Sequence, residues 1–94
     1  MTTETIARIQ RAADRLTDAA STRGAFVPLS VSFVGRRLAS DDPDTRLWAL
    51  KHADMVASAV AAAHHAPEIT RAAAAIRLEI YAATHYRRTH AELL

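Results

Sequence analysis

The chain has 94 residues and a mass of 10.2 kDa, which is room for one small domain, and we expect a single helical domain over residues 1–94. Its 50% hydrophobic and 23% charged residues are typical of a folded globule, and the absence of Cys excludes disulfides, thiol nucleophiles and thiolate metal sites. The net charge of +2 is too small to make nucleic acid the default partner. No basic start followed by an apolar segment and no apolar run of ~20 residues is present, so we expect a cytoplasmic protein with no membrane partner.

The composition favours helix, because Ala supplies 22 residues while Gly supplies 2 and Pro 3. A first helix is predicted over about residues 3–23, since its apolar residues recur three and four positions apart: Ile6, Ile9, Ala13, Leu16 and Ala20. Thr2 or Thr3 is expected to cap its start, and Gly24 is expected to end it.

The segment from Ala25 to Ser40 carries two patterns. Residues 29–34 alternate between apolar and polar side chains like a strand, but no second strand is available to pair with them. We therefore predict a short helix over about residues 30–39, capped by Ser30, with inward-facing Val31, Val34 and Leu38. Whether residues 26–34 form helix, strand or coil stays open at this point.

Two helix-start signals organise the rest of the chain. Asp42 suits an N-cap and Pro43 the first helical position, which predicts a helix over about residues 43–65. The Ala66-Pro67-Glu68 sequence repeats this signal and opens a last helix over about residues 67–92. Their expected inward stripes are Ala49, Ala53, Val56, Val60 and Ala63 in the first, and Ile69, Ala73, Ile76, Ile80 and Ala83 in the second. The fold class is thus an all-α bundle of three longer helices and one short one.

Each of these two helices also has a second apolar row. In the helix over about residues 43–65 this row consists of Trp48, Met55, Ala59 and Ala62. In the last helix it consists of Ala74, Leu78, Tyr81 and His85. A helix that is apolar on more than one side needs more than one neighbour. The other helices of a compact monomer could cover these rows, or a second chain could do so in a homodimer that shares the last two helices. Trp48 itself is expected in the core.

Two segments resemble known helical families. Residues 42–50 resemble the helix opening of a HEAT-type repeat, and residues 67–73 echo them, which implies stacked helical repeats. However, Pro43 and Pro67 are only 24 positions apart, whereas such repeats are ~40 residues long, and helix-start chemistry explains both matches.

The second resemblance is to a helix-turn-helix. Ala20 and Gly24 have the spacing of its turn, and residues 31–38 resemble its recognition helix. This resemblance implies a DNA-binding regulator over residues 20–38, in which Ser32, Arg36 and Arg37 contact phosphates or base edges. The link over residues 25–30 is longer than the usual turn of about three or four residues.

The chain carries no recognisable catalytic pattern. His64 and His65 are adjacent, and His85 and His90 are five positions apart, so none has a metal-ligand spacing. A Gly-rich phosphate loop and a Ser nucleophile elbow are absent from the sequence. The helical chorismate mutases are near in size, but no Arg–Glu pair that would match their pattern follows Lys51. We expect neither an enzyme nor a cofactor or metal ion.

The strongest candidate site is a strip on the last helix. Four residues follow one another on one face at offsets of four, four and three: Arg77, Tyr81, His85 and Arg88. Arg and aromatic residues are enriched at contact surfaces, so we predict that this strip binds another protein or a second copy of the chain. The alternative for Tyr81 is packing on the bundle with its hydroxyl in water. The expected function is a non-catalytic interaction module of accessory or regulatory type, and the DNA-binding regulator is the alternative.

Overall fold

The computed structural model describes the backbone of residues 2–24 and 34–93, and the side chains of residues 2–24, 34 and 36–84. Over these ranges the secondary structure is helical, with α1 at Thr3–Thr22, α3 at Val34–Leu38, α4 at Pro43–Ala63 and α5 at Pro67–Leu93. This confirms the predicted all-α bundle of three longer helices and one short helix. The predicted Ser30 cap, the inward Val31 and the conformation of residues 26–33 lie outside the described residues.

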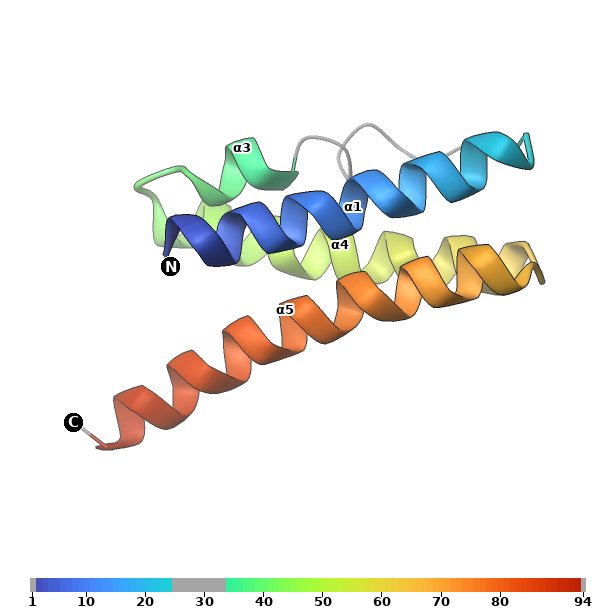
Figure 1. Ribbon diagram of the computed structural model, residues 1–94. Coiled ribbons are helices and arrows are strands. Elements are labelled where there is room, and N and C mark those ends of the chain that lie inside the picture. The colour runs from blue at the N-terminus through green and yellow to red at the C-terminus, as the bar shows by residue number, and fades with distance from the viewer. Residues whose placement is uncertain (1, 25–33, 94) are drawn as a thin grey trace.

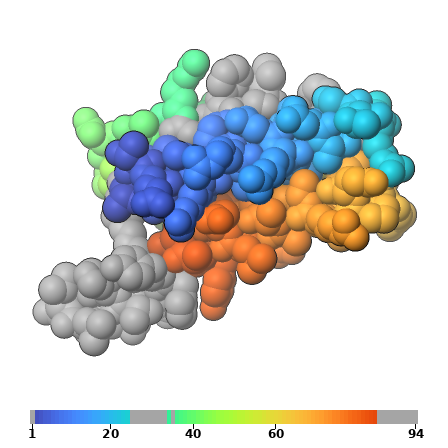
Figure 2. Space-filling view, in the orientation of Figure 1, coloured from blue at the N-terminus to red at the C-terminus, as the bar shows by residue number. Residues whose placement is uncertain are grey.

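The helices form an elongated bundle with principal extents of 45 × 21 × 19 Å. As Figure 1 shows, α1 and α4 run in the same direction, and α5 returns antiparallel to both. Helix α5 packs along α1 and α4, and α3 contacts these same two helices near their starts. Figure 2 shows α1 and α5 lying along one another over one face of the molecule. The side of α4 and α5 that faces away from α1 and α3 therefore has no neighbouring helix in the described part of the chain.

The two ends of α1 agree with the sequence prediction. The Oγ1 atom of Thr2 accepts a hydrogen bond from the Thr5 amide at 3.1 Å, which makes Thr2 the N-cap. The helix ends at Thr22, and Gly24 follows with a φ of +70°, in the left-handed region where glycine is favoured.

Helix α4 begins as predicted and ends earlier than predicted. Asp42 is its N-cap, and Pro43 occupies the first turn. The helix predicted over about residues 43–65 ends at Ala63, and His64 has an extended backbone. Pro67 disfavours helical dihedrals in Ala66, the residue before it, so the helix does not continue into α5. Residues 64–66 then reverse the chain into α5.

The Asp42 cap makes a pH-dependent contribution to stability. The hydrogen bond from the Thr45 hydroxyl at 2.7 Å, and next the one from the Asp44 amide, hold the pKa of Asp42 below its ordinary value of 3.8. A carboxyl with a lowered folded-state pKa stabilises the fold above its unfolded pKa, and this contribution disappears as the pH falls through the folded pKa.

We therefore expect Asp42→Ala to lower the melting temperature at neutral pH and to lose this effect at pH values well below 3.8. Thermal unfolding followed by circular dichroism from neutral to strongly acidic pH measures it. Asp41→Ala, one residue outside the cap, is the matched control. Equal destabilisation by both variants, or a difference that persists in strong acid, would contradict this role of the Asp42 carboxylate.

The core is a single cluster built largely from small side chains. The predicted stripes are buried at most positions, including Ile9 and Leu16 on α1 and Ile69 and Ile76 on α5, whereas Ala63 is exposed. Val34 and Leu38 of α3 face inward as predicted. Eight of the 18 buried hydrophobic residues are alanines: Ala12, Ala13, Ala20, Ala49, Ala53, Ala57, Ala66 and Ala73. These alanines allow the helices to pack closely, but each of them buries little apolar surface area.

Trp48 does not lie in this core. The prediction that it is a core residue was wrong, because its side chain is 45% exposed. Its neighbours Ala49 and Leu50 take the inward positions of this turn of α4, which leaves Trp48 on the opposite side of the helix.

Candidate protein-binding surface

The large apolar side chains that remain exposed are concentrated on two helices. Within residues 2–24 and 34–84 they are Leu47 at 46%, Trp48 at 45%, Met55 at 61%, Leu78 at 68% and Tyr81 at 64% exposure. All five belong to α4 or α5, and α1 and α3 contribute none in the described ranges. Single exposed apolar residues are common on protein surfaces, but a group on one side of a molecule indicates a contact site.

The second apolar rows predicted from the sequence account for most of this group. Their described members are exposed, namely Trp48, Met55, Ala59 and Ala62 on α4 and Ala74, Leu78 and Tyr81 on α5. The described helices of the monomer cover the inward stripes and leave these rows open to solvent. The sequence allowed the other helices of a compact monomer to cover both rows. This arrangement is not found among the described residues.

A hollow of 550 Å³ lies between Asp54 of α4 and the second apolar row of α5. It is lined by Asp54 of α4 and by residues of α5, namely Ala74, Arg77, Leu78, Ile80, Tyr81 and Thr84. We call the surface around it the outer face, defined by Met55, Ser58 and Ala62 on α4, Ala74, Leu78 and Tyr81 on α5, and the Asp54–Arg77 pair between the helices. The hollow gives this face a concave centre into which side chains of a partner can fit.

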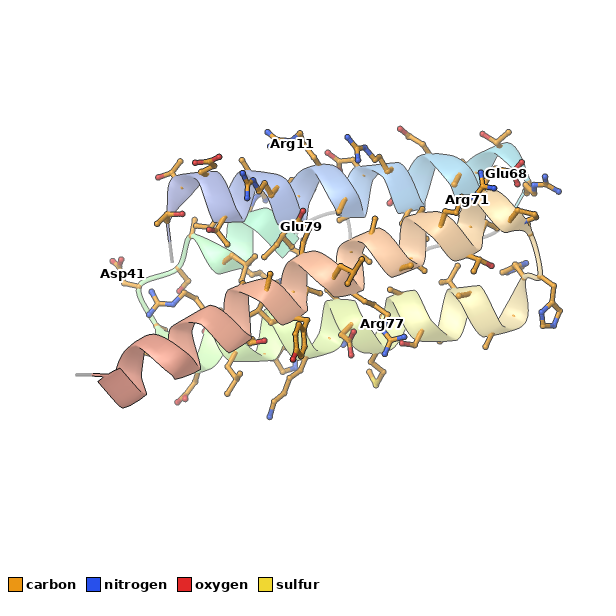
Figure 3. The ribbon with its side chains drawn as sticks, turned by 60° about the horizontal axis from the view of Figure 1, so that its bottom comes forward. Arg11, Asp41, Glu68, Arg71, Arg77 and Glu79 are labelled. Carbon is orange, nitrogen blue, oxygen red and sulfur yellow. The ribbon has the colours of Figure 1, made fainter. Side chains whose placement is uncertain are left out.

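An ion pair joins α4 to α5 across the outer face. The Nε atom of Arg77 donates to Oδ1 of Asp54 at 3.0 Å, and both side chains are about half exposed. Figure 3 shows Arg77 directed from α5 toward α4, on the far side of the bundle from Arg11. An exposed pair of this kind stabilises the fold by only ~0–1 kcal/mol. Its main consequence is that the charges of both side chains at the centre of the face are already balanced.

The structure brings two of the four predicted protein-binding residues together. Arg77 and Tyr81 both line the hollow. The positions of His85 and Arg88 continue helix α5, but their side chains lie outside the described residues. Sequence reasoning did not assign Asp54, Met55 or Leu78 to the site. Membership of the second apolar rows was the available signal for Met55 and Leu78, whereas the contact of Asp54 with Arg77 depends on how the two helices are aligned.

Trp48 joins a separate cluster at the junction of α3 and α4. Its ring stacks on that of His52 with centroids 4.7 Å apart and planes 10° apart, and the Arg37 guanidinium lies 4.6 Å from the Trp48 ring centroid. A cation over an aromatic ring at an exposed site is worth ~0.5–1 kcal/mol. This contact helps to hold α3 against α4, so part of the exposed apolar surface of Trp48 already has a partner within the chain.

The residues predicted to contact nucleic acid are only partly described. Arg36 and Arg37 are exposed on α3, and Ser32 lies outside the described residues. Helix α3 has five residues, and Arg37 lines a hollow together with Asp42 and Asp44 at the start of α4. These two carboxylates oppose the attraction that Arg37 exerts on a phosphate.

The ionisable side chains of the described residues do not gather into a metal site. Within the part of the chain that the structure describes, no three His, Asp or Glu side chains lie close enough to hold a metal ion. None of the helices over the described residues combines the length and the apolar character that crossing a bilayer requires.

Comparison with known proteins adds no further assignment, since no protein-family model, no curated protein and no solved structure matches this chain.

Proposed function

We propose that this protein is a non-catalytic interaction module that binds a protein through the outer face of α4 and α5. One observation carries the proposal: the exposed large apolar side chains of the described residues all lie on these two helices, and Leu78 and Tyr81 among them line a hollow. Leaving such side chains in water forgoes roughly 1.5–3 kcal/mol for each one that a partner would bury. A regulatory or accessory role in the cytoplasm is part of this proposal.

The residue types of the outer face support a protein partner. Tyr and Arg are the types most enriched among residues that dominate binding energy, and Met and Leu supply apolar area around them. Arg77 is held by Asp54, so it would lose little conformational freedom when a partner arrives. Tyr81 combines a large ring with a hydroxyl that can stay at the wet rim of an interface.

A photo-crosslinking residue at position 81 tests this proposal in the cell that makes the protein. We expect irradiation to join position 81 to a protein, in an adduct that disappears when Leu78→Glu is added. The matched control carries the same crosslinker at position 11 on α1, which lies on the far side of the bundle from Arg77 (Figure 3). Failure to form any protein adduct at position 81, or equal adducts at positions 81 and 11, would refute the proposal.

DNA binding through residues 20–38 remains the second candidate, because Arg36 and Arg37 are exposed beside each other on α3. It predicts salt-sensitive binding to duplex DNA that the double substitution of Arg36 and Arg37 by Ala abolishes. The protein-binding proposal predicts no such binding at low salt, and it predicts normal adducts at position 81 in the double variant.

A further inference from the structure

We draw no further inference here: the strongest candidate, the exposed apolar surface of α4 and α5 around Leu78 and Tyr81, carries none beyond the proposed function, because nothing in the described residues shows what covers it.

Discussion

Replacing Ile76 with Ala is expected to lower the free energy of unfolding by about 2–5 kcal/mol. Ile76 is fully buried on α5, in a core in which eight of the 18 buried hydrophobic residues are Ala. The alanine-rich surroundings belong to closely packed helices, which cannot collapse far into the cavity. Because domains of this size are stable by only ~5–15 kcal/mol, this loss would remove a large share of the total.

Chemical denaturation of the variant and the natural chain measures this effect. Leu78→Ala is the matched control, since Leu78 lies two residues further along α5 and is 68% exposed. At protein concentrations low enough for the monomer, we expect Leu78→Ala to change the unfolding free energy by less than about 0.5 kcal/mol. A similar loss for both variants in the monomer would contradict the assignment of Ile76 to the core and of Leu78 to the surface.

Replacing Leu78 with Glu is expected to weaken the binding of a protein partner at the outer face by roughly 10–100-fold. Leu78 is 68% exposed, and a partner that buries its side chain gains ~1.5–3 kcal/mol. The loss of this contribution corresponds to the stated factor, since 1.4 kcal/mol is about tenfold in affinity. A buried carboxylate without an opposite charge would add to the loss of apolar contact.

The yield of the protein adduct formed by a photo-crosslinking residue at position 81 measures this weakening. Arg11→Glu on the far side of the bundle is the control, and we expect its adduct yield to stay within about threefold of the natural chain, because only long-range electrostatics changes. Unchanged helical circular dichroism shows that Leu78→Glu still folds. An equal loss of adduct in the two variants would mean that net charge, and not the outer face, controls binding.

The sequence predicted the helices because their signals are local. Asp42 with Pro43 marks the start of α4, Gly24 follows the end of α1, and the apolar spacing identifies the buried side of each helix. These features depend on the chain within a few residues of each position. The end of α4 lies at Ala63, within two residues of the predicted position.

The positions of Trp48 and of the Asp54–Arg77 pair depend on how helices pack. The apolar spacing of α4 placed Ala49 in the inward stripe and Trp48 in the second row, but Trp48 was expected in the core and is 45% exposed. Asp54 and Arg77 are 23 positions apart, and only the register between α4 and α5 brings them to 3.0 Å. The second apolar rows were visible in the sequence, but their exposure follows from the absence of a described helix over them.

The decisive measurement is whether a photo-crosslinking residue at position 81 of α5 joins this chain to a protein. We expect an adduct that Leu78→Glu removes, and none from the same crosslinker at position 11 on α1, on the far side of the bundle. A chain that forms no adduct at position 81, or equal adducts at positions 81 and 11, does not bind a protein through the outer face.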